Sequence, residues 1–179
     1  TPYLENYISG VILFEETLFQ NHTNGASFVS CLQDKNIIPG IKVDKGLNIL
    51  YGGCEKETTT LGLDDLYERA QKYYQQGARF AKWRALFPMK KNKEPSTLAI
   101  KENSWLLGRY ARIVQEAGLV PIVECEVSLE GEHSIQEMSR VQDKVLKEVY
   151  HSLYENKVFL PGTLLKPSIT IQGDRKSVV

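Results

Sequence analysis

The chain has 179 residues, 42% of them hydrophobic, and its 22 basic side chains are matched by 22 acidic ones. This composition excludes a disordered or collagen-like chain, and the even charge argues against binding nucleic acid or a membrane surface through bulk charge. The length suits one domain over residues 1–179, and no apolar run reaches the roughly 18 residues that a membrane-spanning helix needs.

The start of the chain lacks the basic-then-apolar order of a secretory signal peptide. The cysteines are odd in number and widely spaced, at Cys31, Cys54 and Cys125. Neither a disulfide framework nor a zinc ribbon fits this spacing. We therefore expect reduced thiols in a cytoplasmic protein that does not insert into a membrane.

Two apolar runs come first in chain order, at residues 8–14 and 37–43, and both are typical of strands. A short helix is expected between them, at residues 28–35. The polar segments at residues 55–62 and 88–94 are expected to be loops.

The rest of the chain repeats one order: an amphipathic helix, a turn residue and a short apolar strand. The helix at residues 64–76 precedes a strand at 78–84, and the helix from Ser96 to Gly118 precedes a strand at 119–126. The last helix opens with the capping box Ser134-x-x-Glu137, and strand segments are expected after it at 158–160 and 163–166.

The expected strand centres lie 30 to 42 residues apart, at Val11, Ile41, Phe80, Ile122 and Leu164. A strand–helix–strand unit needs roughly 30 residues or more. Regular alternation of this kind predicts a parallel sheet with outer helices, either doubly wound or closed into a barrel.

Charged residues at the ends of the strands favour the barrel. They occur as i, i+2 pairs, which point to the same side of a strand: Lys42 with Asp44, Lys82 with Arg84, and Glu124 with Glu126. A lone Lys166 ends the fifth strand. One such pair by itself is typical of a solvated edge, but four coincident strand ends converge in the mouth of a (β/α)₈ TIM barrel, where catalytic residues lie. The chain accounts for about five of the eight βα units.

These residue types indicate Schiff-base chemistry. Lys166 follows two leucines and precedes a proline, so desolvation and the nearby cation of Lys82 favour a neutral amine, which can attack a carbonyl. Glu124 is placed to shuttle protons. Lys42 and Arg84 remain as anion-binding groups, which predicts a phosphorylated carbonyl substrate.

Six stretches carry a resemblance to a known family: Gly10–Phe14, Gly40–Gly46, Glu57–Thr60, Phe80–Arg84, Pro121–Glu124 and Gly162–Pro167. In this order they resemble class I fructose-1,6-bisphosphate aldolase. The resemblance implies a (β/α)₈ barrel, a homotetramer, and reversible cleavage of fructose 1,6-bisphosphate to dihydroxyacetone phosphate and glyceraldehyde 3-phosphate without a metal or other cofactor. It also allows cytoskeletal or adhesin-tail partners.

Carried over by position, Lys166 matches the Schiff-base lysine, Glu124 the acid/base carboxylate, and Lys82 the lysine that activates the amine and contacts substrate. Arg84 and Lys42 match groups that bind phosphate and substrate oxygens. The resemblance implies supporting roles for Glu126 and Asp44.

Two positions depart from the family pattern. Cys125 stands where the family usually has proline, and its alternation on the strand predicts that it faces outward and is tolerated. Pro161 stands where the family usually has glutamate, and a proline in a strand paired on both sides would remove a hydrogen bond.

The resemblance covers the family's strands two to six. Strand one with its aspartate, strands seven and eight with a serine and an arginine, and the C-terminal tail with its tyrosine are expected outside this chain.

Three alternatives remain. A transaldolase or deoxyribose-phosphate aldolase would share the chemistry of the lysine, and a catalytically impaired aldolase homologue would act as a binding or scaffold protein. A metal-dependent aldolase would need clustered ligands, whereas the histidines are scattered at His22, His133 and His151. We expect His133 to be a loop residue and His151 a surface residue of a helix.

Overall fold

The computed structural model describes residues 3–23, 25–55, 57–89 and 94–175. Its centre is a parallel five-stranded sheet in the order β1-β2-β5-β6-β7. The strands of this sheet are β1 (Gly10–Leu13), β2 (Ile38–Lys42), β5 (Phe80–Phe87), β6 (Val120–Val127) and β7 (Leu164–Pro167). Neighbouring strands in space therefore follow one another along the chain, as the regular spacing of the apolar runs predicts.

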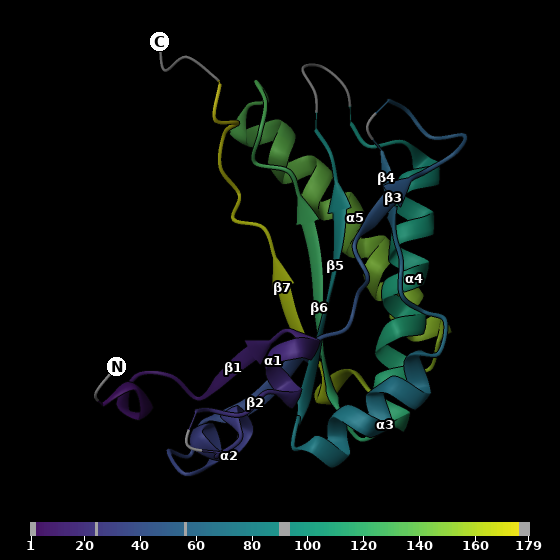
Figure 1. Cartoon of the computed structure of the whole chain (residues 1–179). Coiled ribbons are helices and arrows are strands. Elements are labelled where there is room, and N and C mark those ends of the chain that lie inside the picture. The colour runs from purple at the N-terminus through teal and green to yellow at the C-terminus, as the bar shows by residue number, and fades with distance from the viewer. Residues whose placement is uncertain (1–2, 24, 56, 90–93, 176–179) are drawn as a thin grey trace.

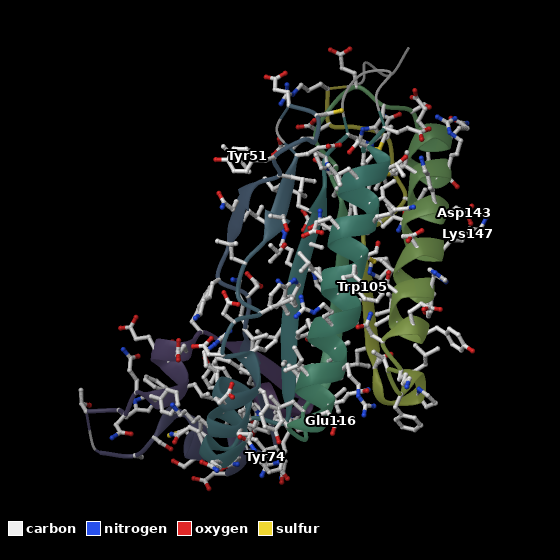
Figure 2. All side chains as sticks on the ribbon, turned by 90° about the vertical axis from the view of Figure 1, so that its right-hand side faces the viewer. Tyr51, Tyr74, Trp105, Glu116, Asp143 and Lys147 are labelled. Atoms are coloured by element: carbon white, nitrogen blue, oxygen red, sulfur yellow. The ribbon has the colours of Figure 1, made fainter. Side chains whose placement is uncertain are left out.

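The helices are α1 (Glu15–Phe19), α2 (Phe28–Gln33), α3 (Leu66–Gln76), α4 (Thr97–Glu116) and α5 (Ile135–Glu155). The long helices α4 and α5 lie side by side on one side of β5 and β6 (Figures 1 and 2). Figure 2 also shows Trp105 on the outer side of α4, where it is exposed. No described helix is long and apolar enough to cross a membrane.

Strand β5 shows how this arrangement separates two faces. Every second side chain of β5 is completely buried beneath the helices: Ala81, Trp83, Ala85 and Phe87. Trp83 stacks on Tyr110 of α4, with ring centroids 5.4 Å apart. The residues between them are half-buried and point to the opposite face, which bears the charged residues of the strand.

On the opposite face, the aromatic ring of Phe80 covers the neighbouring backbone near the start of β5. A Cβ atom on Gly40 would lie 2.1 Å from the Phe80 ring, and one on Gly10 would lie 2.9 Å from it. Glycine at both positions therefore lets the ring cover β1 and β2 closely.

Three short elements differ from the sequence predictions. The antiparallel pair β3 (Leu47–Ile49) and β4 (Thr58–Thr60) places a strand inside the segment expected to be a polar loop. Helix α1 follows β1 without having been predicted. All three elements are short, and hydrophobic periodicity carries little information over three to five residues. Within the second expected loop, residues 90–93 lie outside the described part of the chain.

The prediction of a strand at residues 158–160 is wrong. Val158 is a buried connection after α5, and residues Leu160–Gly162 form a 3-10 helix, η2, before β7 begins at Leu164. Pro161 lies in the first turn of η2, where a backbone N–H has no partner within the helix. The expected conflict between Pro161 and strand pairing therefore does not arise.

The boundaries of α3, α4 and α5 agree better with the sequence predictions than those of the short elements do. The capping box at the start of α5 is present, with the Ser134 side chain accepting from the backbone of Glu137 and the Glu137 carboxylate accepting from Ser134. A second 3-10 helix, η1 (Leu4–Asn6), precedes β1.

His151 is exposed on α5 as expected, whereas His133, a loop residue, is buried.

Candidate active site

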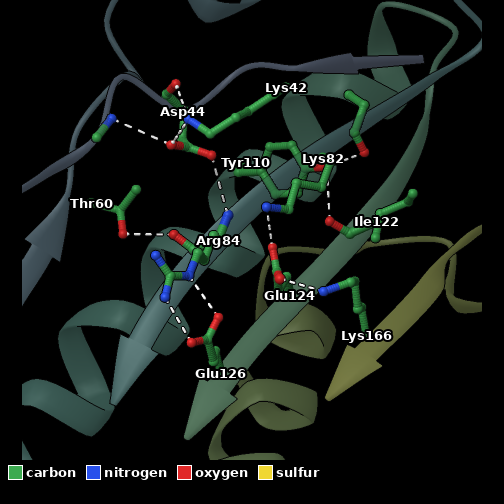
Figure 3. A network of polar contacts seen from close by, with 12 residues as sticks. Lys42, Asp44, Thr60, Lys82, Arg84, Tyr110, Ile122, Glu124, Glu126 and Lys166 are labelled. Carbon is green, nitrogen blue, oxygen red and sulfur yellow. Dashed lines mark hydrogen bonds and ion pairs between the residues drawn. The ribbon is translucent and has the colours of Figure 1, made fainter. Parts of the chain in front are cut away.

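Seven predicted site residues gather on the face of the sheet away from α4 and α5 (Figure 3). They lie at the carboxyl ends of β2 and β7, but within β5 and β6, because β5 continues to Phe87 and β6 to Val127 beyond the predicted strand ends. The parallel register places Arg84 opposite Glu124, and Glu124 opposite Lys166. The charged pairs therefore meet because same-face residues of adjacent parallel strands lie side by side.

Glu124 lies between two lysines. One carboxylate oxygen is 2.5 Å from the Lys166 amine, and the other forms an ion pair with the Lys82 amine. Glu124 is only 4% exposed, and this burial raises the pKa of its carboxyl. The hydrogen bonds from Lys166 and Lys82 outweigh the effect of burial and hold the pKa of Glu124 below its ordinary value. A charged carboxylate between two amines can pass a proton to or from either one.

The expected desolvation of Lys166 is not found among the described residues. Its side chain is 56% exposed, and Leu164 and Leu165 beside it are also exposed. The reason is that β7 is an edge strand of the described sheet, so no further strand covers it. The ion pair with Glu124, rather than an apolar environment, holds the amine in place.

Arg84 and Glu126 form a two-pronged ion pair across β5 and β6. Nε of Arg84 lies 2.7 Å from one carboxylate oxygen of Glu126, and Nη2 lies 2.7 Å from the other. This pairing raises the pKa of Arg84 despite partial burial. Because the two parallel bonds fix the plane of the guanidinium, its direction over the sheet is set before any ligand binds.

Lys42 and Asp44 form the third charged pair. The Lys42 amine lies 2.5 Å from the Asp44 carboxylate and 5.9 Å from the centre of the Phe14 ring. Asp44 also accepts from the backbone N–H groups of Gly46 and Arg84. The side chain of Asp44 is nearly inaccessible, while that of Lys42 is partly exposed.

Two further side chains contact the backbone of the site strands. The Thr60 hydroxyl donates to the Arg84 carbonyl at 2.8 Å, and the buried Tyr110 hydroxyl contacts the carbonyls of Ala81 and Ile122 at 2.6 and 3.2 Å (Figure 3). Burial raises the pKa of Tyr110 well above its ordinary value, so its hydroxyl remains a donor. Thr60 lies within one of the six stretches that carry the resemblance, but a neutral hydroxyl gives no sequence signal of such a contact, and the same holds for Tyr110.

Two pockets open beside the charged residues. One, of about 300 Å³, is lined by Glu124, Glu126 and Lys166 among others, and the second, of about 620 Å³, by Arg84 and Glu126 among others. Glu126 is common to both. In the described ranges, no group of three or more His, Cys, Asp or Glu side chains is placed to hold a metal ion.

A parallel sheet with outer helices, and with lysines and carboxylates gathered on its opposite face, defines part of a (β/α) barrel. Over residues 1–178 the chain matches the family described as fructose-bisphosphate aldolase class-I. The chain therefore belongs to the class I fructose-bisphosphate aldolase family, as the six stretches predicted.

Individual relatives of known name belong to the same family. The chain is 53% identical over 173 residues to the chloroplastic fructose-bisphosphate aldolase 3 of Arabidopsis thaliana, covering 97% of this chain and 44% of that protein. It is 50% identical over 179 residues to the cytosolic aldolase 6 of the same plant, covering 100% of this chain and 49% of that protein. The chain spans about half the length of the curated relatives it matches.

A solved structure confirms the fold. The fructose-bisphosphate aldolase of Plasmodium falciparum, in a ternary complex with TRAP and a small-molecule inhibitor, superposes with a TM-score of 0.97 and 48% identity. The match covers 100% of this chain and 52% of that one. The predicted partial (β/α)₈ barrel is therefore confirmed.

Proposed function

We propose that the protein is a class I fructose-bisphosphate aldolase that reversibly cleaves fructose 1,6-bisphosphate to dihydroxyacetone phosphate and glyceraldehyde 3-phosphate in glycolysis and gluconeogenesis. The contact of the Glu124 carboxylate with the amines of both Lys166 and Lys82 carries this proposal. Membership of the family and the identity of about 50% to named aldolases support it.

In the proposed reaction, the neutral Lys166 amine attacks the substrate's C2 carbonyl, and its nitrogen bonds to that carbon. The carbonyl oxygen takes a proton, and loss of water gives an iminium, which accepts the electron pair of the C3–C4 bond as that bond breaks. Glu124 is the proton carrier for these steps, and by the resemblance Lys82 is the lysine that activates the amine and contacts the substrate. A base must also remove the C4 hydroxyl proton; by resemblance it is the aspartate of a strand outside this chain.

Lys42 and Arg84 are proposed to bind phosphate and substrate oxygens. Both side chains are partly exposed, and each is already oriented by a carboxylate partner, Asp44 for Lys42 and Glu126 for Arg84. A guanidinium with a fixed plane can present two parallel donors to a phosphate, whereas an ammonium acts as a point charge.

Borohydride trapping tests the role of Lys166. Borohydride reduces an iminium to a stable amine, so dihydroxyacetone phosphate should label the purified protein at Lys166, as detected by peptide mass spectrometry. Lys166→Ala should abolish the label. Lys45→Ala, which removes an exposed lysine that is paired with Asp65, should label as the unchanged protein does. Unaltered labelling of Lys166→Ala would contradict the proposal.

The assembly, cellular location and partners of the protein are also proposed. We propose a homotetramer located in the cytoplasm, with cytoskeletal or adhesin-tail partners; the relatives include both cytosolic and chloroplastic aldolases, and the Plasmodium aldolase was solved in complex with TRAP. Residues 1–179 are proposed to form one continuous part of the barrel domain. Native mass measurement tests the assembly, and a monomer at micromolar concentration would contradict it.

The alternatives are less well supported. A transaldolase or deoxyribose-phosphate aldolase does not fit the family match, and neither does a metal-dependent aldolase. A non-catalytic scaffold protein has no specific observation in its favour, because the relatives are named as aldolases.

Activity that persists in the presence of a chelator is expected, and chelator-sensitive cleavage would count against the class I mechanism.

A further inference from the structure

Strand β5 continues past the end of its neighbour β2. The ladder between the two strands ends where Lys42 pairs with Lys82 and the Val43 N–H donates to the Lys82 carbonyl at 3.0 Å. Backbone groups of alternate residues point to the same side of a strand. The N–H and C=O of Arg84 therefore point toward the space where β2 would continue, and they need other partners.

Two side chains take the place of the absent strand. The Asp44 carboxylate accepts from the Arg84 N–H at 3.4 Å, and the Thr60 hydroxyl donates to the Arg84 carbonyl at 2.8 Å. Figure 3 shows both contacts on the same flank of β5. Thr60 is 3% exposed, so water has little access to replace its hydrogen bond.

The segments that carry these two side chains are tied to each other. Lys45 N–H donates to the Leu61 carbonyl at 2.8 Å, and Leu61 N–H donates to the Gly46 carbonyl at 2.9 Å. Asp44 and Thr60 therefore lie next to residues that are directly hydrogen-bonded, although they are distant in sequence. Together they form a clamp on Arg84, which we call the Asp44–Thr60 clamp.

The clamp and Glu126 hold Arg84 at two different places. The clamp fixes the backbone, while Glu126 fixes the guanidinium through its two 2.7 Å contacts. Within the clamp, Asp44 makes the longer contact, and its other oxygen is engaged by Lys42 and Gly46. Thr60 therefore makes the shorter of the two contacts on the Arg84 backbone.

We propose that Thr60 is a positioning residue for substrate binding: its hydroxyl holds the Arg84 backbone so that the guanidinium faces the phosphorylated substrate. Thr60 acts through Arg84 and does not itself touch the substrate. The proposal rests on the proposed aldolase function, in which Arg84 binds phosphate or substrate oxygens.

The test compares Thr60→Val, which keeps the shape and removes the hydroxyl, with Thr60→Ser, which keeps the hydroxyl. Thr59→Val is the matched control, because the Thr59 hydroxyl lies on the same strand but contacts Glu102 instead, at 3.3 Å. The readout is the concentration of fructose 1,6-bisphosphate that half-saturates borohydride trapping at Lys166, together with the trapped fraction at saturation. Thermal unfolding of each variant checks that it is folded.

The half-saturating concentration should rise about three- to tenfold in Thr60→Val, the change that one net hydrogen bond converts to. The trapped fraction at saturation should stay the same, because Lys166 and Glu124 are untouched. Thr60→Ser should lie within about twofold of the unchanged protein, as should Thr59→Val. In an Arg84→Lys background, Thr60→Val should add little, because the two residues act together.

Equal half-saturation in Thr60→Val and Thr59→Val would overturn the inference, and so would full additivity with Arg84→Lys. If Thr60→Val does not fold, the pair Thr60→Ser and Thr60→Ala makes the same comparison of a hydroxyl present and absent. Failure of all three to fold would overturn the inference by making Thr60 purely structural. No trapping in the unchanged protein would instead contradict the proposed aldolase function.

Discussion

At the scale of single residues, adjacent positions of β6 have opposite environments. Glu124 and Glu126 face the site, while Cys125 between them is 1% exposed and packs among the core residues beneath the helices. This confirms the prediction that Cys125 alternates outward from the barrel interior. Burial raises the pKa of the Cys125 thiol to about 11, so little reactive thiolate forms near neutral pH.

Thiol reactivity should therefore separate the cysteines. At pH 8, Ellman's reagent should modify the exposed Cys54 quickly and Cys125 only as fast as the protein unfolds. Stopped-flow absorbance measures these reactions, and the Cys54→Ser variant should lose the phase that belongs to Cys54, while the partly exposed Cys31 still reacts. A Cys125 reaction as rapid as that of Cys54 would contradict the buried placement.

Single residues also mark the limit of the sequence prediction. The i, i+2 pairs of charged residues predicted which side chains meet, because strand alternation is a rule of geometry. The Thr60 contact was not predictable, since it joins Arg84 to a residue 24 positions away through a neutral hydroxyl. The apolar neighbours of Lys166 in the sequence do not reveal that its strand lies at an edge of the described sheet.

At the scale of elements, the long ones were predicted well and the short ones poorly. Helices α4 and α5 each contain nearly six turns of periodic apolar residues, about 3.6 residues to a turn, whereas β3, β4 and η2 have only three residues each. The close packing of α4 on α5 was also invisible in the sequence pattern. It depends on Gly108, where a Cβ atom would lie 2.6 Å from the Ser152 carbonyl oxygen.

Gly108→Ala should consequently destabilise the protein by about 1–3 kcal/mol, even though alanine is the better helix former. The added methyl meets backbone of α5, which cannot move aside as a flexible side chain would. Urea unfolding followed by circular dichroism measures the change. Lys147→Ala on the exposed side of α5 is the control and should change stability by less than about 0.5 kcal/mol. A more stable Gly108→Ala protein would contradict the packing described here.

At the scale of the whole molecule, the site also connects the strands of the sheet. Glu124 of β6 pairs with Lys82 of β5 and with Lys166 of β7, so one carboxylate links three neighbouring strands. The ion pairs of the candidate site therefore also hold neighbouring strands together.

Lowering the pH should weaken the ion pairs of Glu124 with Lys82 and Lys166. Because the pKa of Glu124 is lowered in the folded protein, its stabilising contribution is present above the unfolded pKa of about 4.3 and is lost as the pH falls through the lower folded value. Between pH 7 and pH 3, Glu124→Gln should lose less unfolding free energy than the unchanged protein. Urea unfolding at both pH values measures this, with Glu116→Gln on the exposed end of α4 as the control. Equal losses in Glu124→Gln and the unchanged protein would contradict the ion-pair description.

The strict alternation along β5 has a consequence for genetic variation. In a saturation mutagenesis experiment, positions 81, 83, 85 and 87 are completely buried and should reject substitutions because the protein no longer accumulates. Positions 82 and 84 should instead yield abundant but inactive protein. Abundance and activity scores would then alternate from one codon to the next, so a variant's position along this strand would predict how it fails.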